Sequence, residues 1–479
     1  MGRKSYKTSR GCVAAGAAGL AFFGARPLLA AEGGGNGGSL DVILILVAIV
    51  GVAYLVAHML LERIAERFGI VTGVEYIILG AVAFQVIAVP ALPGGPDVTG
   101  QERVDLLVEQ LRPILVLGTG SLGLMWGTHV HLRAFDKYDR AAFQPALVMS
   151  LTTFVCVAVL PAIFIWYFYS SQRLYDMAPI LVAGGAVAMI ASDDPIRSLV
   201  SFLGAEGDAP VIASRIADVC SGLAIVAFGL LFCIDNTGAL VPEGPYDWLA
   251  WLGVHIVLGG TLGVIFGTFL RRDLSDEKVL TVVIGMVVFT SGIADGLSLS
   301  PIFVNFVLGV VLIQTCRHGD HIRKMIESIK HPIYIVLFIF AGAQLDFSVP
   351  LWAYAMAGPY LLLRLAGRWA GGVLARVNIE GKPHVPSLGR VLFAPGGLSI
   401  AMMLDFLTVY GARTMSASGP FFGTTHDVNA FYSGMVVAII VSEILAYAMT
   451  RAWLIDAADV TTSPNGDEST ETLDITGVS

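Results

Sequence analysis

Long apolar segments separated by short polar ones run along almost the whole chain. Thirteen of them reach or approach the length of about 20 residues with which an α-helix spans a bilayer. A closed barrel would show shorter segments of alternating polarity, so the pattern predicts an all-α polytopic membrane protein. The predicted spans cover residues 39–60, 70–90, 112–131, 142–169, 177–200, 210–234, 246–270, 278–296, 300–316, 332–346, 350–377, 389–410 and 428–455.

Lys and Arg residues between these spans predict the orientation of the chain. If the mature amino terminus lies outside, eighteen basic residues fall in cytoplasmic loops, and four (Arg103, Arg112, Arg173 and Arg413) fall in external ones. Cytoplasmic loops typically carry such an excess. Because a missed helix would reverse every later loop, the asymmetry supports both the count of thirteen and a cytoplasmic carboxyl terminus.

The composition agrees with a membrane protein and excludes several other classes. Hydrophobic residues make up 56% of the chain and charged residues 14%, against about 25% charged in soluble proteins. No basic run suggests nucleic acid as a partner. The five cysteines have no paired spacing, so neither a disulfide framework nor a metal knuckle is predicted. We expect no cofactor.

The two ends of the chain differ from the part between them. Residues 1–31 resemble a signal or targeting segment, because basic residues precede an apolar stretch too short to span comfortably. An uncleaved anchor is the alternative. Residues 32–455 form the predicted transmembrane domain. Residues 456–479 contain several acids and no Lys or Arg, which predicts a disordered cytoplasmic tail.

Two spans contain residues that interrupt helices at mid-depth. The fifth contains Ser192, Asp193 and Asp194 directly before Pro195, and the twelfth contains the run Pro395–Gly397, in which Gly396 and Gly397 follow the proline. Proline removes a backbone donor and frees carbonyl groups. The two spans lie seven apart, which predicts six-helix repeats in inverted orientation. Paired interrupted spans indicate the binding site of a transporter near the midplane.

Three acids near the first interruption could bind a cation. Asp218 lies within the sixth span, where a carboxylate costs roughly 2.5–3.5 kcal/mol on insertion scales. We expect Asp193, Asp194 and Asp218 to lie close together. Their carboxylates and the freed carbonyl groups would offer the hard oxygen ligands that metal cations such as Na⁺ prefer. Burial and neighbouring charge raise the pKa of carboxylic acids. An acid that titrates near neutral pH can exchange its proton for a cation.

Structural explanations compete with this interpretation. Asp193 and Asp194 could cap a helix at a loop, and Asp218 could be a hydrogen-bonding structural acid. Arg364 and Arg368 in the eleventh span could snorkel to the interface or balance a carboxylate, and the sequence does not choose between these. For Glu75, Asp405 and Glu443 we favour structural roles, and we expect His255 to be a packed neutral histidine. The run Gly118–Gly123 matches G-x-G-x-x-G but lies inside the third span, which favours close helix packing over nucleotide binding.

Several motifs resemble the monovalent cation:proton antiporter superfamily, which comprises sodium/proton and potassium/proton exchangers. They are T-G-V-E-Y-I-I-L-G (72–80), G-L-S-L-S-P-I-F-V-N-F-V-L-G (296–309) and F-I-F-A-G-A-Q-L-D-F (338–347), within a resemblance that covers about residues 40–455. The resemblance implies a homodimer in the cell inner membrane that exchanges a monovalent cation, Na⁺ or K⁺, for protons by an elevator-type mechanism. It implies no enzymatic activity.

The resemblance also assigns the ion site. The family has Thr-Asp-Pro on the fifth helix and Asn-Asp or Asp-Asp on the sixth, so Asp194 and Asp218 take the acidic positions, with Asp218 the principal carrier. This chain departs from the pattern at Asp193, which replaces Thr, and at Ala217, which replaces Asn or Asp. It also lacks the Glu and Arg that the sodium/proton branch often pairs between the sixth and twelfth helices. These departures place it in a divergent branch.

Three other functions are alternatives to exchange. A sensor or interaction protein could use the antiporter fold without transport. An intramembrane aspartyl protease would need a Gly-x-Gly-Asp signature, which is absent. Sodium-coupled symport of an organic solute is disfavoured because the acids are closely grouped, which suits a small cation better than a large solute.

Overall fold

The computed structural model describes residues 73–82, 100–130, 137–168, 171–203, 205–206, 208–234, 246–270, 276–316, 319–345, 347, 349–375, 388–416, 425–457 and 459–460. The first predicted span and the segment 1–31 therefore lie outside the described residues. Seven helices of the described part are long and apolar enough to cross a membrane, and the shorter helices 301–315 and 396–410 are also apolar. The predicted all-α membrane fold is confirmed, whereas the count of thirteen spans and the inverted repeat remain predictions.

Helices account for nearly all of the regular structure in the described ranges. They are α3 (Val74–Val82), α5 (Gly100–Thr128), α6 (Lys137–Phe154), the π-helical turn η2 (Val155–Val159), α7 (Leu160–Phe168), α8 (Ser171–Met189), α9 (Asp194–Leu203), α10 (Asp208–Ile234), α11 (Asp247–Phe269), α12 (Asp276–Gly296), α13 (Pro301–Thr315), α14 (Gly319–Ser328), α15 (Lys330–Ala343), α16 (Leu351–Ala355), α17 (Ala357–Ala375), α18 (Leu388–Val391), α19 (Gly396–Ser416) and α20 (Thr425–Ala457). Strands β1 (Ala205–Glu206) and β2 (Asp459–Val460) form one short antiparallel pair.

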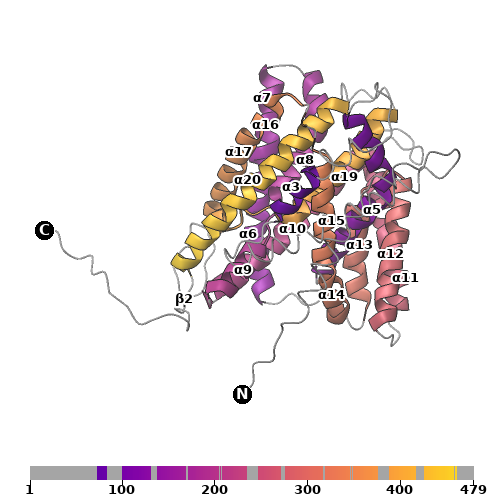
Figure 1. Cartoon of the computed structure of the whole chain (residues 1–479). Helices are drawn as coiled ribbons and strands as arrows, with labels where there is room; N and C mark the ends of the chain where they lie inside the picture. The colour runs from indigo at the N-terminus through magenta and orange to yellow at the C-terminus, as the bar shows by residue number, and fades with distance from the viewer. Residues whose placement is uncertain are drawn as a thin grey trace, which may run out of the picture.

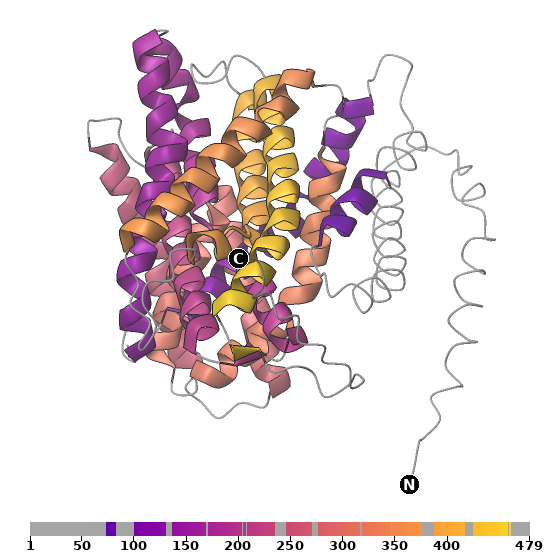
Figure 2. The same cartoon turned by 90° about the vertical axis from the view of Figure 1, so that its left-hand side faces the viewer.

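The helices pack as two bundles that lie side by side. The broken-helix bundle consists of α6 to α10 and α16 to α20, and it contains both interruptions. The straight-helix bundle consists of α3, α5, α11, α12, α13 and α15. In Figure 1, α7, α17 and α20 lie at the left, and α11, α12 and α13 lie at the right. The view in Figure 2 looks onto α17 and α20.

Small residues allow the helices of the straight-helix bundle to approach closely. A Cβ atom on Gly123 or Gly127 of α5 would collide with the backbone of α13, at Ile302 and Phe306 respectively. The glycines of the run Gly118–Gly123 thus serve close helix packing, as the sequence predicted.

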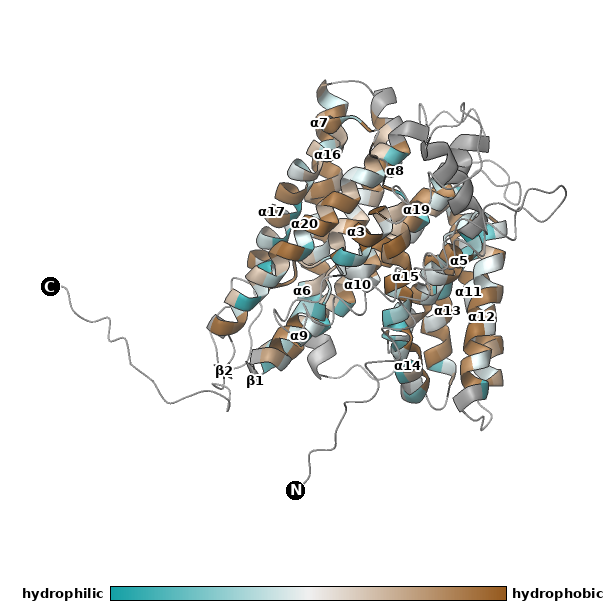
Figure 3. Cartoon of the chain, in the orientation of Figure 1, coloured by the Kyte–Doolittle hydropathy of each residue, from teal (hydrophilic) through white to brown (hydrophobic). Residues whose placement is uncertain are grey.

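Apolar side chains cover the outward faces of the helices. Trp166, Tyr167 and Phe168 on α7 are among the most exposed, as are Val257 on α11 and Leu362 on α17. Brown, hydrophobic residues dominate α11, α12 and α17 in Figure 3, while α14 carries more teal, hydrophilic ones. Lipid is the solvent that such surfaces require, so the chain is a multi-pass membrane protein.

Candidate functional site

The first interruption falls where the sequence predicted it. Helix α8 ends at Met189, and α9 begins at Asp194, with Pro195 in its first turn. A proline is tolerated there because the first turn of a helix has no intrahelical partner for its N–H groups. Residues 190–193 between the two helices are not helical.

Two fully buried arginines of α17 bind the carbonyl groups at the end of α8. The Arg364 Nη2 atom lies 2.8 Å from the Ile190 oxygen, and its Nε atom lies 3.3 Å from the Ala188 oxygen. Arg368 Nη2 donates to both of these oxygens, at 2.7 and 3.2 Å, and also to Met189 O. The carboxyl-terminal end of a helix carries a partial negative charge. The arginines therefore neutralise a helix end and do not snorkel, since both are 0% exposed.

At the second interruption, an acidic side chain caps the amino end of a helix, whereas basic side chains cap the helix end at the first. Helix α18 ends at Val391, and α19 begins at Gly396, directly after Pro395. The Gly396 N–H donates to Glu443 Oε2 of α20 at 3.1 Å. A carboxylate is favourable at the positive amino end of a helix. Glu443 thus has the structural role that we favoured, although the sequence did not indicate its partner.

The two interruptions cross each other. The Ser192 N–H donates to Ala394 O at 2.8 Å, which joins the two unwound segments directly. Gly396 has φ of 64°, and a Cβ atom there would lie 2.5 Å from the Ser192 Cβ. On the other side, a Cβ on Gly397 would lie 2.6 Å from the ring of Tyr334 on α15. Both glycines are therefore required by close approach at the crossing.

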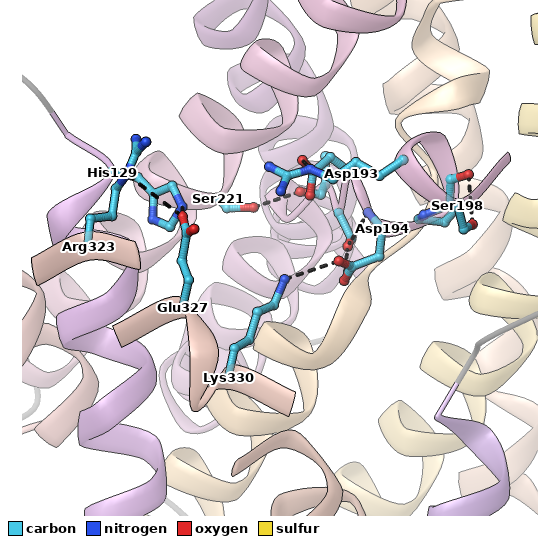
Figure 4. Close-up of polar contacts among 12 residues, drawn as sticks. His129, Asp193, Asp194, Ser198, Ser221, Arg323, Glu327 and Lys330 are labelled. Carbon is cyan, nitrogen blue, oxygen red and sulfur yellow. Dashed lines mark hydrogen bonds and ion pairs between the residues drawn. The ribbon is translucent and has the colours of Figure 1, made fainter. Parts of the chain in front are cut away.

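Asp193 and Asp194 lie at this crossing, and each has a basic partner. Asp193 is 3% exposed and pairs with Arg197, one turn further along α9. Asp194 accepts from Ser192 Oγ at 2.9 Å and lies 3.1 Å from the Lys330 ammonium. Figure 4 shows Lys330 reaching from α15 to Asp194. The Lys330 contact therefore joins the straight-helix bundle to the broken-helix bundle.

Asp218 lies on α10 beside the first interruption. One turn after it, Ser221 donates to Ala191 O at 2.7 Å, which fixes α10 against the unwound segment. Asp218 is close enough to interact electrostatically with Asp193 and Arg197. In the described part of the chain, however, no hydrogen bond or ion pair holds its carboxylate. Of the three predicted acids, Asp218 is thus the one without a direct counter-ion.

The predicted carbonyl ligands are already occupied in this conformation. The oxygens of Ala188, Met189 and Ile190 accept from arginine, and the oxygen of Ala191 accepts from Ser221. Within the ranges described, no group of three or more His, Cys, Asp or Glu side chains is arranged to hold a metal ion. The three acids are near one another, but they do not form a closed cage.

Sequence reasoning missed Lys330 and the roles of Arg364 and Arg368. Lys330 is one of the eighteen basic residues that the predicted orientation places in cytoplasmic loops, because it lies two residues before the tenth predicted span. A single basic residue beside an apolar span does not indicate that it bonds an acid of another helix. Among the remaining acids, Asp405 on α19 accepts from Ser300 Oγ at 2.6 Å and is buried. His255 is also buried, and its Nδ1 lies 2.8 Å from Trp251 O.

Solved structures with this fold include a sodium proton antiporter. The structure of MjNhaP1 from Methanocaldococcus jannaschii at pH 8 matches 86% of this chain and 99% of its own, with a TM-score of 0.63 and 15% identity. An electron-microscopy map of the same antiporter matches with a TM-score of 0.60 and 14% identity, over 86% of this chain and 98% of that one.

One curated protein is also similar in sequence. The ammonium/H⁺ antiporter subunit AmhT of Alkalihalophilus pseudofirmus is 22% identical over 211 residues, which make up 42% of this chain and 51% of that protein. The match therefore spans about half the length of the relative. No protein-family model matches the chain. The chain therefore shares its fold with this solved sodium proton antiporter.

Proposed function

We propose that this protein exchanges a monovalent cation, Na⁺ in the first place, for protons across the cell inner membrane. The observation that carries the proposal is the position of Asp193, Asp194 and Asp218 beside the crossing of two interrupted helices, in a chain with an antiporter fold. Interrupted helices at such a crossing are a common basis for ion sites in secondary transporters.

Asp218 is the proposed carrier of cation and proton. Arg197 and Lys330 partner the other two acids, so Asp218 is the carboxylate most free to bind a cation. An isolated charge in this setting is costly, and either a proton or a metal cation removes that cost. Only one of the two can occupy the carboxylate at a time, which is the minimum requirement for exchange.

Asp194 is the proposed second ligand. Its contact with Lys330 is a single 3.1 Å bond between the two bundles. A cation that binds between Asp194 and Asp218 would compete with the Lys330 ammonium for the same oxygen. Ser192 donates to the other carboxylate oxygen, Oδ2, and would keep the Asp194 side chain in position for the cation.

An elevator-type motion fits the arrangement of the helices. The three acids lie at the start of α9, directly before it and on α10, in the bundle that contains both interruptions. The straight-helix bundle packs beside this bundle. Movement of the first bundle against the second would expose Asp218 to each side in turn. We further propose a homodimer, with the amino terminus of the mature chain outside and the carboxyl terminus in the cytoplasm.

A cation series in everted vesicles tests the proposal. Vesicles that contain the protein are acidified by respiration, and a pH-sensitive dye reports proton release when Na⁺, Li⁺, K⁺ or NH₄⁺ is added. We expect Na⁺ to collapse the proton gradient, and vesicles with the Asp218→Asn variant to keep it. If no cation collapses the gradient although the protein is inserted, the non-transporting sensor becomes the better interpretation.

A further inference from the structure

A groove runs between the outer faces of α17 and α20. Its volume is about 660 Å³, and binding pockets for small molecules have about 300–1,000 Å³. Leu362, Ala366 and Trp369 of α17 line one wall, and they lie four and three residues apart. Ala448 and Ala452 of α20 line the other wall, four residues apart. Such intervals place side chains on one side of a helix. Figure 2 looks onto this face of the molecule.

The walls of the groove are apolar and exposed. Leu362 is 70% exposed and Trp369 is 51% exposed. Ala366, Ala448 and Ala452 are exposed as well, and their short side chains leave the space between the two helices open. Lipid is the solvent that such a surface requires, so an acyl chain fits the groove better than a polar solute does.

Helix α18 closes one end of the groove and places Arg390 there. A Cβ atom on Gly389 would collide with the backbone oxygen of Arg368, so α18 lies directly against α17. On the other side, the Thr450 hydroxyl of α20 donates to Val391 O at 3.4 Å. Arg390 lies between these two contacts and lines the groove. The contacts with both helices therefore fix the position of Arg390, which is the only charged residue among the described residues that line the groove.

Arg390 is exposed, and no hydrogen bond or ion pair holds its guanidinium group within the ranges that the structure describes. A guanidinium presents parallel donors that match the oxygens of a phosphate group. Basic pockets between transmembrane helices on the cytoplasmic side bind the headgroups of anionic lipids, and the orientation proposed above places Arg390 on that side. A groove with one cationic end and apolar walls matches a phospholipid with a negatively charged headgroup.

We propose that this groove binds one anionic phospholipid, with its phosphate group on Arg390 and an acyl chain between α17 and α20. Helix α17 also carries Arg364, which binds the end of α8, and α20 carries Glu443, which caps α19. The lipid therefore joins the two helices that hold both interruptions, and it stabilises the broken-helix bundle. The site does not depend on the proposed exchange of cations for protons.

Native mass spectrometry of the full-length protein in detergent tests the site, because it counts bound lipids and protein copies at once. Phosphatidylglycerol is titrated, and phosphatidylcholine, whose headgroup has no net charge, is the reference lipid. We expect the first phosphatidylglycerol to bind the wild type about fivefold more tightly than phosphatidylcholine, since one basic residue near anionic lipid contributes a factor of about five. Arg390→Gln should lose this preference.

Two further variants distinguish the groove from the rest of the surface. Arg451→Gln removes another exposed arginine near the end of α20, but Arg451 does not line the groove, so this control should keep the preference of the wild type. Ala452→Phe places a ring between the helices and keeps Arg390, so it should weaken binding of the first phosphatidylglycerol severalfold. Saturating phosphatidylglycerol should also raise the midpoint of thermal unfolding by a few degrees in the wild type and in Arg451→Gln, but not in Arg390→Gln.

Three results would overturn the proposal. The wild type could bind both lipids equally, or Arg390→Gln or Ala452→Phe could bind phosphatidylglycerol as the wild type does. Arg451→Gln could lose as much affinity as Arg390→Gln, which would indicate a general attraction to basic residues. Ala452→Phe could abolish a dimer of the wild type while lipid binding is unchanged, which would make the groove a contact between two copies of the chain. A protein that binds the lipid but exchanges no cation would refute only the proposed function.

Discussion

Replacing Arg368 with methionine should destabilise the protein more than the same replacement of Arg364. Both side chains are 0% exposed and come from α17, one turn apart, so the two variants are closely matched. Methionine keeps much of the volume of the arginine side chain and removes its charge and its hydrogen-bond donors. Any gain from removing a buried charge is similar at both positions.

The difference follows from the carbonyl groups that each variant leaves without a donor. Ala188 O and Ile190 O accept from both arginines, so either variant leaves them with one partner. Met189 O accepts from Arg368 and not from Arg364. A buried carbonyl without a donor costs about 1–3 kcal/mol, so Arg368→Met bears this cost and Arg364→Met does not. Arg364→Met instead loses the cation–π contact with the Phe393 ring, which is worth about 1–2 kcal/mol and which a methionine sulfur near the same ring partly replaces.

Thermal unfolding in detergent, followed by the amount of protein that remains monodisperse after heating, measures the difference. We expect the midpoint for Arg368→Met to lie a few degrees below that for Arg364→Met, and both to lie below the wild type. If Arg364→Met is the less stable variant, or if neither differs from the wild type, the two arginines do not neutralise the end of α8 as described.

Three further predictions concern the crossing and the ion site. Asp194→Asn should reduce exchange more than Asp193→Asn, because Asp194 bonds Lys330 across the bundles whereas Asp193 pairs with the nearby Arg197 of its own bundle. Equal rates in proteoliposomes would contradict this. Gly396→Ala should lower the midpoint of thermal unfolding by an amount that corresponds to about 1–3 kcal/mol, because its Cβ atom would collide with Ser192. Gly260→Ala is the control and should leave the midpoint unchanged, because no atom of another residue lies near that position on α11. Exchange should be electroneutral, because Arg197 and Lys330 balance the charge of two of the three acids. The membrane potential is worth about 2.3 kcal/mol per charge per 100 mV. An exchange rate that changes steadily with a valinomycin-clamped potential would therefore refute this prediction.

Local chemistry allowed the interruptions to be predicted from the sequence. Pro195 and Pro395 each remove a backbone donor, and each lies at or directly before the start of the helix that follows a break. The acids were recognisable because carboxylates are rare in apolar spans. The regular spacing of apolar segments likewise predicted the helical membrane fold.

The partners of these groups could not be predicted in the same way. Arg364 and Arg368 are about 175–180 residues from the carbonyls that they bind, and Lys330 is 136 residues from Asp194. Such pairs depend on which helices become neighbours and on their rotation, and neither follows from one periodic pattern. The expected carbonyl ligands are an example. The broken helix frees its carbonyl groups, but donors from distant parts of the chain then bond to them.

Asp218→Asn in proteoliposomes tests the central claim most directly. Purified protein is reconstituted, an inward sodium gradient is applied, and an internal dye reports proton efflux. Asp208→Asn, an exposed acid at the start of the same helix, is the matched control. An amide cannot exchange a proton for a cation, so we expect the Asp218 variant to match protein-free liposomes, and the control and wild type to exchange. Sodium-driven proton efflux at the wild-type rate in the Asp218→Asn variant would contradict the account.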